Sequence, residues 1–169
     1  FDQGAMIEAF QRNLPKADVA VCTAMSNVYG FRLPIMEISQ LCRAIEVPLI
    51  VDASQLAGCG SIDFAALGAA YIAMPGHKGL LGPQGTGLLL CGGDTAPLLF
   101  GGTGNQSMLQ TMPEDLPERL EAGTLNVPGI AGLGAGLSYL EGIGVENIGR
   151  REQKQAEKCA KGLEKLGFQ

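Results

Sequence analysis

The sequence predicts an α/β protein with a mostly parallel sheet and helices on both faces of that sheet. Short apolar segments alternate along the chain with segments of helical spacing, which is the order of strand–helix–strand units. The apolar segments are continuous instead of alternating with polar residues, as is typical of strands that are buried on both faces. With 169 residues, the chain is long enough for one domain with a core of its own.

Three strands and three helices are predicted in the first half of the chain. The strands are the apolar segments at residues 17–23, 49–53 and 69–74. Two helices are predicted at residues 4–12 and 34–45, where residues recur at helical spacing, and a short helical turn is predicted at residues 63–67. Prolines mark the boundaries, since Pro15 follows the first helix, Pro34 opens the second and Pro48 precedes the second strand.

A glycine-rich loop, a strand, an irregular stretch and two helices are predicted in the second half. The loop covers residues 75–84 and the strand covers 85–91. Residues 101–124 show no regular pattern, and a loop of that length is usually functional. Helical patterns follow at 127–141 and 146–166. The GLGAG sequence inside the first of these helices follows no strand, so it indicates close helix packing and not a nucleotide loop.

Charge and hydropathy exclude two classes of partner. The net charge is −5 and no basic run could neutralise phosphates, so we expect no nucleic acid partner. No apolar run in residues 1–169 reaches the roughly 18 residues that span a bilayer, and we expect no signal peptide. We therefore expect no membrane partner.

The cysteines predict a reducing compartment. Their number is odd and none forms a CxxC pair, which is unlike a disulfide framework or a zinc site. We therefore expect a cytoplasmic location and no metal site. We expect Cys22, Cys42 and Cys91 in the core, and Cys159 on the side of its helix that packs against the rest of the fold.

Residues with the chemistry of a cofactor site follow two neighbouring strands. Asp52 ends one predicted strand with Gln55 close by, and the pair His77 and Lys78 follows the next strand. Open α/β sheets bind their ligands at the carboxyl ends of the strands. Taken singly, Asp52 could be a helix cap or an ion-pair partner. Lys78 could be a surface lysine, and His77 a structural histidine.

Together, these side chains suit a cofactor that has a pyridinium nitrogen and an aldehyde. A carboxylate keeps such a ring nitrogen protonated, so that the ring accepts electrons. A lysine forms a Schiff base with the aldehyde, and burial of the amine favours its reactive neutral form. The glycines around Lys78 let backbone amides approach an anion. No GxxxxGK[ST] motif is present, so a nucleotide P-loop is not supported.

Four motifs carry a resemblance to a known family. They are SNVYG (26–30), VDASQLAG (51–58), PGHKGLLGPQGTG (75–87) and RLEAGTLNVPGIAGL (119–133). In this order they resemble the class V aminotransferase family of fold type I pyridoxal-phosphate (PLP) enzymes, most closely its cysteine desulfurase branch. The resemblance covers nearly the whole chain. It implies PLP as the cofactor and the large-domain fold of a PLP-dependent transferase.

The resemblance implies specific roles for the residues that match the motifs. Lys78 would form the Schiff base with PLP and, with His77, would be the catalytic pair. Asp52 would pair with the pyridinium nitrogen, and His77 would contact the phosphate region. Gln55 and Asn27 would lie near the phenolic oxygen of the ring and tune the Schiff base.

Three further positions bear on the phosphate and the ring. Thr124, in the EAGT motif, would reach the phosphate bound by a neighbouring subunit, which implies a homodimer with sites at its interface. Pro75 stands where the family commonly has a Ser or Thr phosphate ligand. One hydrogen bond to the phosphate is therefore expected to be missing or supplied elsewhere. Ser54 stands where the family often has Ala against the ring face.

We expect residues 1–169 to be the central part of a PLP-binding large domain. The chain begins at Phe1 without an initiator Met and stops at Gln169 just after a helical pattern. The family's phosphate-binding segment and its ring-stacking histidine would precede Phe1. Its small domain, with the substrate-binding arginine and the sulfur-accepting cysteine, would follow Gln169. None of the cysteines in this chain matches that nucleophile, although Cys59 is nearest to the site in sequence.

The resemblance favours a PLP-dependent enzyme that releases sulfur from L-cysteine, giving alanine and a persulfide, with a sulfur-acceptor protein as a further partner. Two alternatives stay open. The same lysine and cofactor could serve a class V aminotransferase or a selenocysteine lyase. The chain could also be a non-catalytic fragment or a dimerisation scaffold that retains the core of a PLP enzyme.

Overall fold

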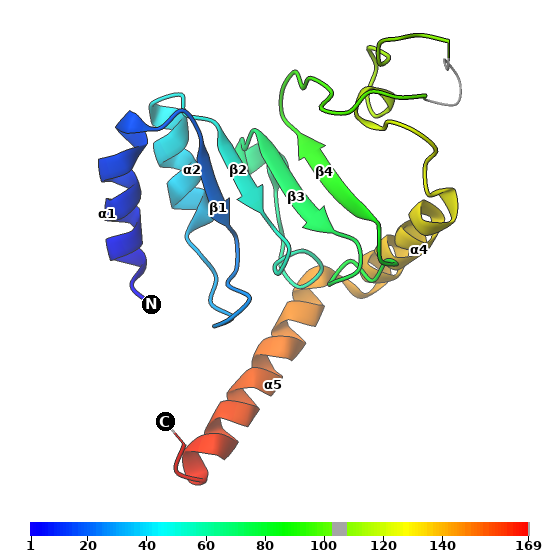
Figure 1. The fold of residues 1–169 in the computed structure, drawn as a ribbon. Coiled ribbons are helices and arrows are strands. Elements are labelled where there is room, and N and C mark those ends of the chain that lie inside the picture. The colour runs from blue at the N-terminus through cyan, green and yellow to red at the C-terminus, as the bar shows by residue number, and fades with distance from the viewer. Residues whose placement is uncertain (103–107, 169) are drawn as a thin grey trace.

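A four-stranded sheet forms the centre of the fold (Figure 1). The computed structural model describes residues 1–102 and 108–168. Its strands are β1 (Ala20–Thr23), β2 (Leu49–Asp52), β3 (Tyr71–Pro75) and β4 (Gly87–Cys91). The first three strands are parallel, and β4 runs antiparallel to β3. The predicted α/β fold with a mostly parallel sheet is confirmed.

The register brings the carboxyl ends of the parallel strands to one edge of the sheet. Thr23, the last residue of β1, is the partner of Asp52, the last residue of β2. Asp52 in turn is the partner of Ala73 in β3. Strand β3 continues to Pro75, which pairs with Gly87 at the start of β4. The loops that follow β1, β2 and β3 therefore start close together.

Three helices from the first part of the chain cover one face of the sheet. They are α1 (Gln3–Asn13), α2 (Ile35–Ala44) and α3 (Phe64–Leu67). The core beneath them contains fully buried Ile38 and Cys42 from α2. These side chains pack with Val51 of β2 and Ile72 of β3, neither of which is exposed. Burial of such side chains is the main force that holds the helices on the sheet.

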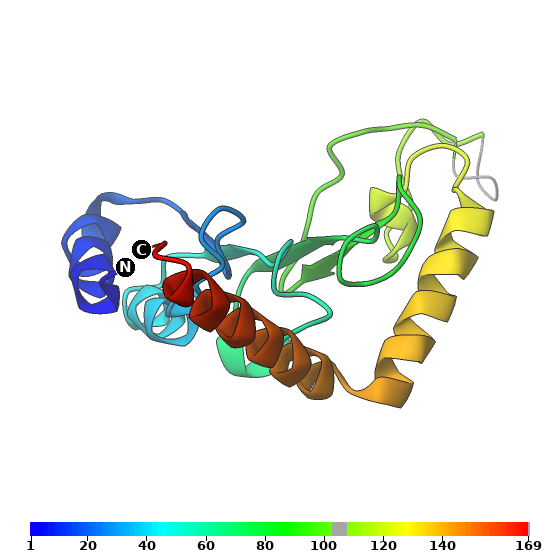
Figure 2. The ribbon, with the colours of Figure 1, turned by 90° about the horizontal axis from the view of Figure 1, so that it is seen from below.

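The opposite face of the sheet carries no α-helix in the described part of the chain. Successive side chains of a strand point to opposite faces, so Val21 and Leu89 point away from the core and are 64% and 51% exposed. In Figure 2, α2, α3 and the last helix lie below the sheet, and the segment that follows β4 and precedes residue 127 lies above it. The sequence predicts helices on both faces of the sheet, but in residues 1–102 and 108–168 the α-helices pack on one face. The reason is that right-handed crossovers place consecutive connecting helices on the same side when the strand order follows the chain order.

The chain after β4 forms a short 3₁₀ helix and two long helices. These are η2 (Glu118–Leu120), α4 (Val127–Ile143) and α5 (Val145–Lys165). Helix η2 lies within the stretch 101–124, for which the sequence predicts no regular element; residues 103–107 of that stretch lie outside the described residues. The side chain of Asn126 begins α4 by accepting a hydrogen bond from the Gly129 N–H at 3.1 Å.

Helices α4 and α5 differ in how they contact the rest of the fold. Leu133 and Leu140 of α4 are buried in a second apolar cluster, and Leu133 lies within the GLGAG sequence (132–136), which confirms that this sequence belongs to a closely packed helix. Helix α5 contributes Val145 and Ile148 to that cluster near its start and then extends away from the sheet (Figure 1). None of its residues is buried. The prediction that Cys159 faces a packed surface is therefore wrong, because nothing described covers that part of α5.

Candidate functional site

A cavity of about 550 Å³ lies at the carboxyl ends of β1 and β2. Its lining includes four of the residues that the sequence singles out, namely Asn27, Asp52, Gln55 and Lys78. They come from three different loops, which the parallel strands bring together. The other lining residues are Met6, Thr23, Met25, Ser26, Tyr29, Phe31, Leu33 and Ser54.

Asp52 is oriented by the turn that follows it. Its Oδ1 atom accepts a hydrogen bond from the backbone N–H of Ser54 at 2.9 Å. On the neighbouring strand, the Thr23 hydroxyl donates to the backbone carbonyl of Asp52 at 3.3 Å. Within residues 1–102 and 108–168, the one ion pair joins Arg119 to Asp94. The carboxylate of Asp52 is exposed, so it remains available to a ligand and is not part of a structural ion pair there.

Lys78 lies in a tight loop between β3 and β4. The N–H of Leu81 donates to the carbonyl of Lys78 at 2.9 Å, and the N–H of Gly82 donates to the carbonyl of Gly76 at 2.7 Å. These two bonds curl the backbone around Lys78. Its side chain lines the cavity but is exposed, so the burial that the sequence argument assumes for the amine is not found.

His77 and Thr124 do not line this cavity. His77 is exposed beside Lys78, in the same loop. Thr124 is exposed in the segment between η2 and α4, which lies beyond β4 in Figure 1. The chain therefore does not bring Thr124 to its own cavity, and a role at a neighbouring subunit stays a prediction.

Several lining residues are absent from the sequence prediction. Thr23 could have been found, because it ends β1 as Asp52 ends β2. Ser26 shapes the loop after β1, since its Oγ accepts hydrogen bonds from the backbone N–H groups of Val28 and Tyr29 at 3.3 and 3.1 Å. The ring of Phe31 stacks with that of Tyr29, at a centroid distance of 5.8 Å. No sequence signal identifies this aromatic contact.

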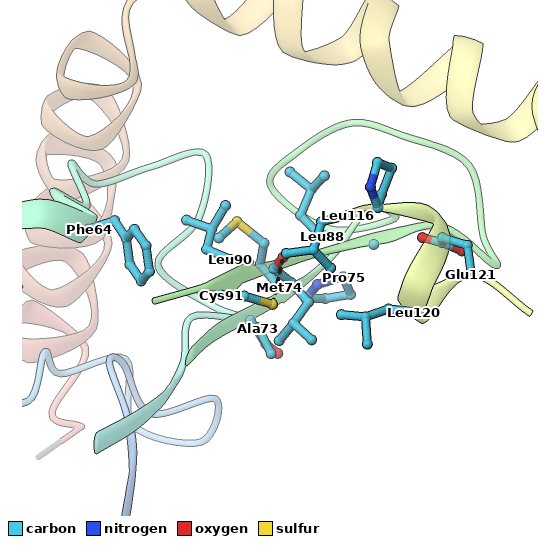
Figure 3. A pocket seen from close by; sticks show the side chains of 14 residues that line it. Phe64, Ala73, Met74, Pro75, Leu88, Leu90, Cys91, Leu116, Leu120 and Glu121 are labelled. Atoms are coloured by element: carbon cyan, nitrogen blue, oxygen red, sulfur yellow. Dashed lines mark hydrogen bonds between the residues drawn. The ribbon is translucent and has the colours of Figure 1, made fainter. Parts of the chain in front are cut away.

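A larger cavity, of about 820 Å³, lies beside β3 and β4 (Figure 3). Its lining is mainly aliphatic, and Leu116 and Leu120 from the segment before α4 contribute to it. Figure 3 shows Leu116 and Leu120 among the side chains that line this cavity, together with Leu88 and Leu90 of β4. The one charged residue of the lining is Glu121, and no lysine or histidine is present. The smaller cavity is therefore the candidate site, because it is the one of these two that combines a carboxylate, amides and an amine.

Comparison with known proteins identifies the family. A sequence model described as aminotransferase class-V matches residues 2–169. The chain belongs to the class V aminotransferase family. It is 38% identical over 141 residues to a probable cysteine desulfurase of Methanothermobacter thermautotrophicus, a match that covers 80% of this chain and 35% of the relative. It is 32% identical over 162 residues to a probable cysteine desulfurase of Pyrococcus abyssi, covering 92% of this chain and 40% of that relative.

A solved structure agrees with this class V aminotransferase assignment. The apo structure of the cysteine desulfurase from Thermococcus onnurineus NA1 matches with a TM-score of 0.85 and 30% identity, over 95% of this chain and 42% of that one. The chain thus spans 35% to 42% of the length of these relatives. Within residues 1–102 and 108–168, no helix is long and apolar enough to cross a bilayer. The same residues contain no group of three His, Cys, Asp or Glu side chains that could hold a metal ion.

Proposed function

We propose that this chain is the central part of the PLP-binding large domain of a cysteine desulfurase that acts on L-cysteine. The carrying observation is that Asp52, Gln55 and Lys78 line one cavity, in a chain that belongs to the class V aminotransferase family. The names of the relatives at 38% and 32% identity support the choice of reaction.

The side chains around the cavity fit PLP chemically. Asp52 offers a carboxylate for the ring nitrogen, and Lys78 offers an amine for the aldehyde. The amides of Asn27 and Gln55 can donate hydrogen bonds to the phenolic oxygen. The fit is weakest at the phosphate, because Pro75 offers no hydroxyl where the family commonly has one.

The residues around the cavity would have the following roles in holding PLP and in moving a proton. When bound, PLP supplies an electron sink that weakens the bonds at the α-carbon of an amino acid. Asp52, held by the N–H of Ser54, would keep a proton on the ring nitrogen. The Nζ atom of Lys78 would hold the cofactor and, once the substrate amine has displaced it, would move the α-proton. His77 would contact the phosphate region, and Gln55 would orient the phenolic oxygen.

The thiol that accepts sulfur is proposed to come from another part of the protein. Burial raises the pKa of Cys22 to about 11, and burial also raises the pKa values of Cys42 and Cys59. Thiols of this kind are poor nucleophiles. In the proposed reaction, an accessible thiolate attacks the sulfur of L-cysteine, an S–S bond forms as the C–S bond breaks, and the products are alanine and a persulfide.

A homodimer and a reducing cytoplasmic setting complete the proposal. Apolar side chains are exposed after β4, where Leu98, Leu99 and Phe100 are 92%, 71% and 64% exposed. Exposed apolar groups in one segment favour coverage by another chain. That segment precedes Thr124, which would then approach the site of the neighbouring subunit. A separate sulfur-acceptor protein would receive the persulfide sulfur.

A non-catalytic scaffold is the second candidate. Two observations favour it, since His77 and Thr124 lie outside the cavity lining and the chain spans 35% to 42% of its relatives. A scaffold would keep the fold without holding PLP. Aminotransfer and selenocysteine lysis use the same residues as desulfuration, so the products distinguish them.

Borohydride reduction after incubation with PLP tests the proposal. The expected result is a phosphopyridoxyl label on the peptide that contains Lys78, mapped by mass spectrometry. K78R should abolish this label, whereas K154R, on the exposed α5, should leave it unchanged. Weak labelling spread over surface lysines, equal in K78R, would support the scaffold. A labelled chain, assayed with L-cysteine as part of its longer protein, should yield alanine; a keto acid would indicate aminotransfer.

A further inference from the structure

We propose that a backbone contact between Gly58 and Gly79 sets the position of Lys78 relative to Asp52, which makes both glycines positioning residues; this rests on the PLP function proposed above. Gly58 lies in the turn that follows Asp52. Gly79 directly follows Lys78. The loop with the carboxylate and the loop with the amine therefore meet at these two glycines.

Neither glycine has room for a side chain. A Cβ atom at Gly58 would lie 2.9 Å from the Cα of Gly79 and closer still to its carbonyl. A Cβ atom at Gly79 would lie 3.4 Å from the Cα of Gly58 and less than 3.0 Å from the carbonyl oxygen of Ala57, a distance that real Cβ atoms essentially never show. The obstructing atoms are backbone, so they cannot rotate away as the end of a side chain can. The Gly58 φ of +89° adds a second reason for glycine there.

Helix α4 supports the same loop from another side. A Cβ atom at Gly136 would lie 2.6 Å from the carbonyl oxygen of Leu80 and 3.0 Å from the carbonyl of Leu81. The side chain of Leu80 is buried in one cluster with Leu133 of α4. The segment that carries Lys78 is thus held between the turn at Gly58 and the backbone of α4.

These contacts fix the amine through main-chain atoms. Main-chain contacts leave little freedom, whereas packed side chains can change rotamer. An added methyl group at Gly79 or Gly136 must displace the loop, and a misplacement of about 1 Å at a reacting group can lower a rate by about 10²-fold. The side chain of Lys78 is exposed and is not held by burial, so the position of the amine depends on these main-chain contacts of its loop.

The experiment compares G79A and G136A with G134A as the matched control. Gly134 lies two residues from Gly136 in α4, but a Cβ atom there would meet nothing within 4 Å. Alanine favours the helix at both α4 positions, which offsets part of the cost of the contact at Gly136, and the thermal unfolding midpoint shows whether each variant folds. Three quantities are measured: the PLP concentration for half-maximal borohydride labelling of Lys78, the pH midpoint of the visible absorbance of bound PLP, and the thermal unfolding midpoint.

In G79A and G136A, we expect the PLP concentration for half-maximal labelling to rise at least about tenfold, and the pH midpoint of the absorbance to shift. G134A should match the unsubstituted chain in both. Labelling at the same PLP concentration in all four proteins overturns the inference and leaves the proposed function in place. Equal loss in G134A and G136A also overturns it, because the effect would then come from the helix. No label on Lys78 in the unsubstituted chain overturns the proposed function and this inference with it.

Discussion

Alkylation of the cysteine thiols should follow their surroundings in the fold. At pH 8, we expect iodoacetamide to modify Cys159 first, because it is exposed on α5, and Cys91 more slowly, because it is partly exposed. Cys22, Cys42 and Cys59 are buried and should stay unmodified while the chain is folded. The order of modification thus tests whether Cys22, Cys42 and Cys59 are too buried to act as nucleophiles.

The magnitude can be worked out for Cys22. Burial, followed by the neighbouring thiol of Cys42, raises the pKa of Cys22 from 9.0 to about 11. Since the thiolate is the nucleophile, a pKa higher by about 2 lowers its reactive fraction at pH 8 about 100-fold. Cys22 is also only 5% exposed, so hindered access makes this factor a minimum.

The raised pKa also gives a direction for the pH dependence. Below pH 9.0 the thiol of Cys22 is neutral in both the folded and the unfolded chain, so its raised pKa does not lower the free energy of unfolding there. Between pH 9.0 and about 11, the unfolded chain ionises first, so the folded state loses stability as the pH rises. Alkylation of Cys22 should therefore accelerate above pH 9.0, because unfolding exposes it.

Timed alkylation followed by peptide mass mapping checks these expectations. In guanidinium chloride all cysteines should react at similar rates, which controls for intrinsic differences. C159S should remove the fastest phase and leave the others unchanged. If Cys22 in the folded chain at pH 8 reacted within a factor of about ten of Cys159, the burial argument would be refuted.

Three further predictions concern stability, each measured by urea unfolding. S39A should lower the free energy of unfolding by about 1–3 kcal/mol, because the buried Ser39 hydroxyl donates to the carbonyl of Leu67; an unchanged value would contradict this. Ile72→Ala should lower the free energy of unfolding by about 2–5 kcal/mol, whereas Leu89→Ala, on the open face, should lower it by less than about 1 kcal/mol. Equal losses would argue against a core on one side of the sheet. Asn126→Ala should cost about 1 kcal/mol through loss of the α4 cap, whereas Asn126→Ser should retain most of it.

The elements of the fold could be predicted from local pattern, but the exposure of their faces could not. Continuous apolar segments locate the strands because the strands are short and bounded by prolines and polar turns. Val21 and Cys22 are both apolar, yet one is 64% exposed and the other is 5% exposed. Residue type does not separate them. Their difference depends on the side of the sheet to which α2 and α3 return, which is a property of the chain path.

The site shows the same division between local and long-range information. The rule that ligands bind at strand ends is enough to bring Asp52, Gln55 and Lys78 together. The same rule points to Thr23, which ends the predicted strand at 17–23, although the sequence prediction does not include it; only its place directly beside Asp52 depends on the register between two strands. The exposure of Lys78 escapes the rule, since exposure depends on what covers the loop and not on the loop sequence.

The cavity at the strand ends also has a consequence for the order of synthesis. All of its lining residues lie between Met6 and Lys78, so a ribosome completes every wall before it reaches β4. Helix α4 and its Gly136 contact are made later. Residues 6–78 therefore supply the side chains that line this cavity. The part after β4 adds the contact of α4 with the loop that carries the amine, so insertions there would alter this support and leave the lining residues unchanged.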